Sequence, residues 1–187
     1  MGTYADLMDA LTLRVTSPDG QLAATLTGRS KLDIAFADGS YSRYTERALE
    51  EQAKYLLQSV FSAQRRAHFD ALSKAQGRMI TEEPPPADNR GKRYRELVAE
   101  AVATGDSRRG TVRVGNRGIT EWKVRIADGT LGRLSSQEFT GELGSALQAM
   151  LRELFVKRGQ LRREAYGVPV ANDELGTVRY NEKGGAA

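Results

Sequence analysis

Cysteine is absent from this chain of 187 residues, which excludes disulfides, thiolate metal ligands and thiol catalysis. No run of about 18 apolar residues occurs, so the sequence predicts no transmembrane helix and no membrane partner. The first residues, MGTYADLMDAL, lack a basic region ahead of an apolar core, so we expect no secretory signal. These absences fit a cytoplasmic protein.

Side chains that usually form catalytic or metal sites are also scarce. His68 is the only histidine, and it lies in a helical pattern beside Phe69 with no cysteine to complete a zinc site. Nucleophile elbows and phosphate-binding glycine loops do not occur. We therefore expect a non-enzymatic protein that holds no cofactor and no metal ion.

The composition is that of a globular protein with a basic excess. Hydrophobic residues make up 40% of the chain and charged residues 28%, which suits a packed core beneath a charged surface. The net charge of +4 favours a polyanionic partner.

An internal repeat emerges when the chain is aligned with itself at an offset of 90 residues. The triplet Ala-Asp-Gly at 37–39 then coincides with the same triplet at 127–129. Other residues coincide at this offset without a gap: Tyr4 with Tyr94, Gly20 with Gly110, Gly28 with Gly118, Arg43 with Arg133 and Leu57 with Leu147. We interpret the two stretches as copies of one unit, with a chance alignment of unrelated segments as the alternative.

The apolar pattern changes period at the same place in both copies. Period-two alternation predicts strands with one buried face over residues 21–27, 30–37, 111–115 and 119–127. The strand residues that we expect to be buried under long helices are Leu32, Ile34, Phe36, Trp122, Val124 and Ile126. After each triplet, apolar steps of three and four predict an amphipathic helix.

Capping residues locate the two long helices. Thr45 is the expected N-cap of a helix that runs to about Lys74. Ser135 and Glu138 have capping-box spacing, which predicts a helix that runs to about Tyr166.

The two copies begin differently. Residues 4–11 predict a short helix in copy one, and residues 11–15 are consistent with a first strand. The stretch KRYRELVAEAVATG, residues 92–105, predicts a longer helix at the start of copy two.

These patterns predict an α+β fold of two tandem modules, residues 1–77 and 91–167, each with an antiparallel sheet of about three strands and flanking helices. Residues 78–90 include the consecutive prolines Pro84–Pro86, which favour an extended linker. Residues 168–187 are rich in glycine and polar residues and predict a mobile tail. Because each module alone is small for a stable core, we expect the two modules to pack together.

Positive charge concentrates in the second module. Residues 1–77 have a net charge of zero, whereas residues 91–167 have a net charge of +6. Clustered Lys and Arg side chains bind phosphates by releasing counterions, and a solvated charged face is the alternative. The candidate DNA-binding residues are Arg108, Arg109, Arg113, Arg117, Lys123, Arg125, Lys157, Arg158, Arg162 and Arg163.

The segment GQLAATLTGRSKLDIAFADG, residues 20–39, followed by a long helix, resembles the YbaB/EbfC family of bacterial nucleoid-associated proteins. The shared features are Gly20, an alternating strand that ends at Gly28, a short polar turn and a second alternating strand. Residues 110–129 show the same frame. The resemblance implies small α/β modules with three antiparallel strands, assembly as a homodimer, and DNA binding with little sequence preference.

This chain departs from the family pattern in three respects. It carries two copies where the family has one module per chain, so the copies are expected to form an intrachain pseudo-dimer. Its first helix is short, and the acidic-proline step after the last strand is replaced by Ala-Asp-Gly.

Two functions are consistent with these features. The first is sequence-nonspecific binding of duplex DNA in the bacterial nucleoid, by a protein that is either a monomer or a homodimer. The second is an adaptor with an acidic protein partner, since the family also includes divergent actinobacterial members linked to specialised secretion loci.

Overall fold

The computed structural model describes residues 3–83, 85–118 and 120–167. It has an α+β architecture with two separate antiparallel sheets, sheet A (β1-β2-β3) and sheet B (β4-β5-β6). Its elements are α1 (Tyr4–Asp9), β1 (Thr12–Thr16), β2 (Leu22–Thr27), β3 (Lys31–Phe36), the 3-10 helix η1 (Tyr41–Arg43), α2 (Glu46–Gln76), α3 (Asn89–Glu100), β4 (Val102–Asp106), β5 (Val112–Arg117), β6 (Glu121–Ile126) and α4 (Ser136–Tyr166).

Equivalent elements of the two halves lie 90 residues apart: β1, β2, β3 and α2 begin and end 90 residues before β4, β5, β6 and α4. The two Ala-Asp-Gly stretches form like turns. The N–H of Ala37 and that of Ala127 each donate to the carbonyl just before the second strand of their sheet, at 2.8 and 2.9 Å. Gly39 and Gly129 have φ of 66° and 75°, which glycine adopts without strain. The two triplets thus occupy equivalent turns, as the sequence predicts.

The predicted helix starts are confirmed. The Thr45 side chain accepts a hydrogen bond from the N–H of Ala48, and α2 extends beyond the expected end to Gln76. Ser135 and Glu138 form the expected capping box at the start of α4.

One predicted helix is wrong in its second part. The stretch 92–105 was expected to be helical throughout, but α3 ends at Glu100 and residues 102–106 form β4. Pairing with β5 outweighs the modest helix propensity of this stretch. Gly105 also has no side chain, and a Cβ atom there would lie 2.2 Å from the Met150 backbone nitrogen. The backbone of α4 therefore rests directly on β4.

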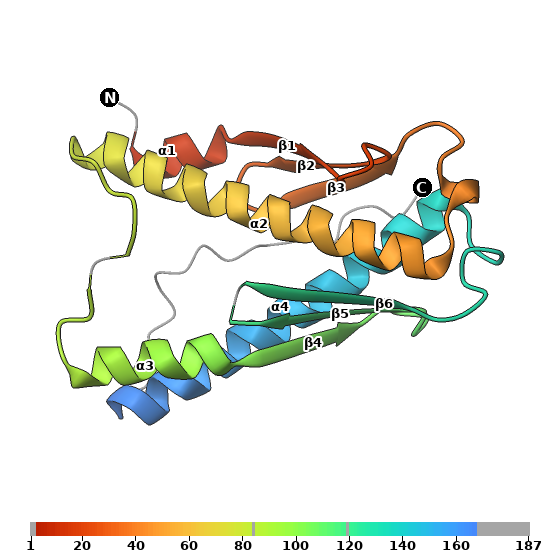
Figure 1. Ribbon diagram of the computed structural model, residues 1–187. Helices are drawn as coiled ribbons and strands as arrows, with labels where there is room; N and C mark the ends of the chain where they lie inside the picture. Colours follow the sequence, from red (N-terminus) through yellow and green to blue (C-terminus); the bar gives the residue numbers. More distant parts are fainter. Residues whose placement is uncertain (1–2, 84, 119, 168–187) are drawn as a thin grey trace, which may run out of the picture.

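The two halves share one hydrophobic core. Helix α2 packs on β1 and β2 and also on β6, whereas α4 packs on β4 and β5 and also on β3 (Figure 1). Each long helix therefore contacts both sheets. The buried side chains of this single cluster include Leu22, Leu49, Leu57, Val112, Val114, Phe139, Leu143, Leu147 and Met150.

The burial of the two third strands differs. Trp122, Val124 and Ile126 of β6 are buried, as predicted. Their counterparts in β3 were also expected to be buried, but Leu32, Ile34 and Phe36 are only partly buried against the core. The Phe61 ring from α2 stacks on Trp122 at 4.6 Å between ring centroids, whereas α4 covers β3 less closely.

The segment between the halves contains neither helix nor strand over the described residues from 78 to 88. Helix α3 then begins at Asn89 with Asp88 as its N-cap, inside the predicted linker. The predicted tail, residues 168–187, lies outside the described residues. None of the helices within the described ranges combines the length and the apolarity needed to cross a membrane.

Candidate nucleic-acid interface

Four of the predicted residues lie on the outward face of sheet B. Alternation along β5 and β6 buries Val114 and Trp122 and leaves the intervening side chains exposed to solvent. In the β5–β6 register, Arg113 lies opposite Arg125 and Gly115 lies opposite Lys123. The other predicted residue on this face is Arg117. The sheet therefore brings these four cations together on one face.

Three of these four cations are already paired with carboxylates. Arg113 donates two hydrogen bonds to Asp106 of β4, at 2.6 and 3.1 Å, and this contact lowers the pKa of Asp106. Arg117 pairs with Glu100 at the end of α3. In the third pair, Arg125 lies 3.0 Å from Glu50 of α2. The side chain of Glu50 is only 12% exposed.

Lys123 has no ion pair with the described residues, unlike the three arginines around it. Four carboxylates lie on this face or pair with its four cations: Asp106, Glu121, Glu50 and Glu100. The outward face of sheet B is therefore close to neutral.

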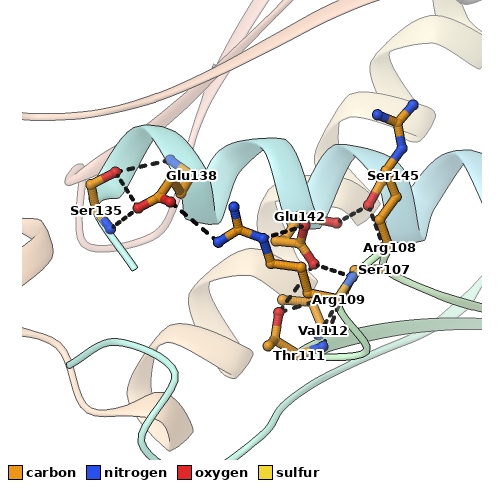
Figure 2. Close-up of polar contacts among 9 residues, drawn as sticks. All are labelled: Ser107, Arg108, Arg109, Thr111, Val112, Ser135, Glu138, Glu142 and Ser145. Atoms are coloured by element: carbon orange, nitrogen blue, oxygen red, sulfur yellow. Dashed lines mark hydrogen bonds and ion pairs between the residues drawn. The ribbon is translucent and has the colours of Figure 1, made fainter. Parts of the chain in front are cut away.

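The turn between β4 and β5 positions Arg108 and Arg109 against α4 (Figure 2). The Arg109 guanidinium donates to Glu138 at 3.2 Å, while the Arg109 N–H donates to Glu142 at 3.0 Å. The Arg108 N–H donates to the Ser145 hydroxyl at 3.2 Å, and Figure 2 shows its guanidinium pointing away from Glu142. The side chain of Arg108 is thus free of ion pairs with the described residues, whereas that of Arg109 is not.

Glu142 is the buried acceptor that holds this turn. Burial on its own raises the pKa of this carboxyl, but hydrogen bonds from Ser107, the Arg109 N–H and the Thr111 hydroxyl outweigh it and lower the pKa. The carboxylate therefore stays charged and fixes the turn to α4.

The other four predicted residues lie near the end of α4. The ammonium of Lys157 contacts Glu153 one turn earlier and the Val102 carbonyl of β4. Within the described residues, Arg158, Arg162 and Arg163 form no ion pair, and the Arg158 Nε is buried without a hydrogen-bond partner. Arg162 and Arg163 are exposed.

Helix α3 adds four cations that sequence analysis did not include in the site. Figure 1 shows α3 beside the last turns of α4, where the rings of Tyr94 and Tyr166 lie 6.0 Å apart. Arg93 also lies 3.8 Å from Glu164. The basic residues of α3 are Arg90, Lys92, Arg93 and Arg95. The sequence shows that these four cations lie close together in the chain. Only the packing of α3 on α4 places them beside the basic residues at the end of α4.

We call α3 and residues 157–166 of α4 together the paired-helix end. Eight Lys or Arg residues and three carboxylates give it a formal charge of +5. Arginines on two adjacent helices can reach phosphates on separate stretches of one polyanion. The paired-helix end, rather than the sheet, therefore carries the largest excess of positive charge in the second half.

No group of His and carboxylate side chains within the described ranges could hold a metal ion. His68 lies 2.7 Å from the Tyr4 hydroxyl through its Nδ1 atom, so it joins α1 to α2. Burial lowers the pKa of His68, which favours the neutral ring at physiological pH.

Comparisons with protein-family models, with curated proteins and with solved structures find no match for this chain.

Proposed function

We propose that this protein binds duplex DNA without sequence preference and that the paired-helix end is its main contact surface. The observation that carries the proposal is the charge of +5 on two adjacent helices, with Arg158, Arg162 and Arg163 in no ion pair with the described residues. On the sheet, by contrast, a phosphate would compete with Asp106 and Glu50 for the arginines. Unpaired cations bind phosphates without that competition.

The binding is expected to be nonspecific. Long Arg and Lys side chains at a helix end reach the phosphate backbone, and such contacts carry no sequence information. Their affinity falls steeply with salt, because each neutralised phosphate releases condensed counterions. This mode of binding and the YbaB/EbfC resemblance together support a role in the nucleoid, in the bacterial cytoplasm.

We further propose that the chain is a tandem duplication of a YbaB/EbfC-like module. The recurrence of strands and long helices at an offset of 90 residues supports a duplication. The packing of α2 on β6 and of α4 on β3 supports an intrachain pair that replaces a homodimer. In this proposal, residues 1–77 and 91–167 are the two modules.

The experiment measures binding of a random-sequence duplex at several salt concentrations. Arg162→Ala/Arg163→Ala removes two exposed charges from the paired-helix end. We expect weaker binding to all sequences and a log–log salt dependence that is flatter by about two units. The matched control is Arg65→Ala/Arg66→Ala, which removes two exposed arginines from α2, outside the paired-helix end, and should change the slope little.

The outcome can contradict the proposal in two ways. If the wild-type protein does not bind duplex DNA at low salt, DNA binding is wrong. If Lys123→Ala/Arg125→Ala flattens the salt dependence more than the helix variant does, the contact surface is the sheet face.

An adaptor with an acidic protein partner is the second candidate. Five of the ten predicted cations, including Arg109 and Arg113, pair with carboxylates within the chain, and the exposed Arg162 and Arg163, which form no ion pair with the described residues, would bind acidic side chains in the same way. Absence of DNA binding, together with salt-sensitive binding of polyglutamate that Arg162→Ala/Arg163→Ala weakens, would favour this candidate.

A further inference from the structure

The free edge of β4 is closed by two side chains of α4. The Glu153 carboxylate accepts a hydrogen bond from the Thr104 N–H at 2.7 Å, and the Lys157 ammonium donates to the Val102 carbonyl. Backbone groups on the edge of a sheet otherwise remain available to pair with another strand. These two contacts therefore block the addition of a strand beside β4.

The equivalent edge of β1 has no such closure. Ala63 and Ala67 of α2 stand 90 residues before Glu153 and Lys157, and neither side chain can form a hydrogen bond. The Leu11 carbonyl and the Ser17 N–H bond to residues of the β2 side. In an antiparallel ladder the intervening residues then direct their N–H and C=O groups away from β2.

Three residues of β1 therefore present backbone groups to solvent: Thr12, Arg14 and Thr16. No hydrogen bond from these outward groups to the described residues is present.

A difference in packing accounts for the open edge. Gly105 allows the backbone of α4 to rest on β4, which brings Glu153 within reach of Thr104. At the equivalent position of β1 stands Val15, whose side chain packs against the core and holds α2 farther from the strand. The first half of the molecule thus lacks both the close approach and the polar side chains that close the edge.

We propose that the open edge of β1 binds an extended acidic peptide segment, which adds to sheet A as a fourth strand. Its backbone would pair with the outward groups of Thr12, Arg14 and Thr16. Its side chains would alternate, with apolar residues beside the half-buried Leu13 and Val15, and a Glu or Asp opposite the exposed Arg14. This site is separate from the paired-helix end and does not depend on DNA binding.

Charge favours an acidic peptide over a second copy of this chain. Arg14 is exposed and has no ion pair with the described residues. If two copies paired antiparallel over the whole of residues 12–16, Arg14 would lie opposite Arg14 of the other copy. Like charges that face each other directly across strands are destabilising, whereas opposite charges are stabilising.

The test uses a labelled nine-residue peptide, Thr-Val-Thr-Val-Glu-Val-Thr-Val-Thr with blocked ends, at concentrations where the free peptide is monomeric. We expect saturable binding to the full-length protein by fluorescence anisotropy, with slower amide hydrogen exchange at Arg14 and Thr16. Arg14→Glu should weaken binding by about twofold to fivefold. The same variant should prefer a peptide with Lys in place of Glu.

Thr16→Pro removes an outward N–H at a position where an edge strand tolerates proline, and should abolish binding. Thr16→Ala is the matched control, because it removes the side chain and keeps the N–H, so it should bind as the wild type does.

Saturable binding that Thr16→Pro leaves unchanged would overturn the proposal, as would a complete absence of peptide binding. A wild-type dimer that Thr16→Pro dissociates would also overturn it and assign the edge to a second copy. Duplex DNA binding by Arg14→Glu and Thr16→Pro should equal that of the wild type, so failure of one proposal is distinguishable from failure of the other.

Discussion

Gly105→Ala is expected to destabilise this protein strongly, although it adds only one methyl group. A Cβ atom at this position would lie 2.2 Å from the Met150 nitrogen, 2.3 Å from the Ala146 oxygen and 2.8 Å from the Ala149 carbonyl carbon. All three are backbone atoms of α4, so no side-chain rotation can relieve the clash. The helix would have to move away from β4 by about 1 Å to restore ordinary van der Waals contact.

The magnitude follows from what that movement disturbs. Overpacking of a core typically costs about 1–3 kcal/mol, and rigid backbone on both sides places this site at the upper end. The shift would also weaken the bond between the Thr104 N–H and Glu153, for about another 1 kcal/mol. We expect a loss of about 3–4 kcal/mol, which for a chain of this size lowers the melting temperature by about 6–16 °C.

The assay is urea and thermal unfolding followed by circular dichroism, with Gly115→Ala as the matched control. Gly115 lies on the neighbouring strand of the same sheet, where a Cβ atom would lie 3.7 Å from the Thr104 methyl group, an ordinary contact. That variant should be as stable as the wild type or slightly more stable, because alanine restricts the unfolded chain. If Gly105→Ala costs less than about 1 kcal/mol, the close approach of α4 to β4 is wrong.

Two further predictions test the core and the buried carboxylate. Trp122→Ala should lower the free energy of unfolding in urea by about 3–5 kcal/mol. Leu32→Ala, at the equivalent and half-buried position, should lower it by less than about 2 kcal/mol. Equal losses would contradict the difference in burial. Glu142→Gln should cost about 2 kcal/mol at pH 7. Because the pKa of Glu142 is lowered from 4.5 in the folded state, its stabilisation is present above that pH and disappears as the pH falls through the folded-state pKa. The difference between wild type and variant should therefore shrink in unfolding measurements below about pH 4.5, and a constant difference would contradict the assignment.

Local signals in the sequence predicted most of the fold. Alternation located β2, β3, β5 and β6, and the caps Thr45 and Ser135 located the long helices, because these features depend on residues close together in the chain. The strand β4 was missed because its residues, Val-Ala-Thr-Gly-Asp, follow a helix without a break in pattern. Pairing with β5 and the contact of Gly105 with α4, more than 40 residues later, explain why this stretch is extended.

The candidate site was predicted less completely than the fold. The cations of the second half were visible in the sequence, but their carboxylate partners were not. Glu50 and Arg125, for example, are 75 residues apart and belong to different halves. The sequence also did not place α3 beside α4. Apart from the pair of Lys157 with Glu153 one turn earlier, the contacts that decide which cations are free join different elements of the fold and leave no local signal.

The carboxylates that close sheet B also determine where a polyanion can bind. Glu50 accepts the Ile126 N–H of β6 at 2.8 Å and pairs with Arg125. Glu153 accepts the N–H of β4 and pairs with Lys157. Each carboxylate thus accepts a hydrogen bond from the backbone of an edge strand and also neutralises a neighbouring cation. A phosphate that displaced either one would break a backbone hydrogen bond as well as an ion pair, whereas a phosphate at Arg162 would break neither.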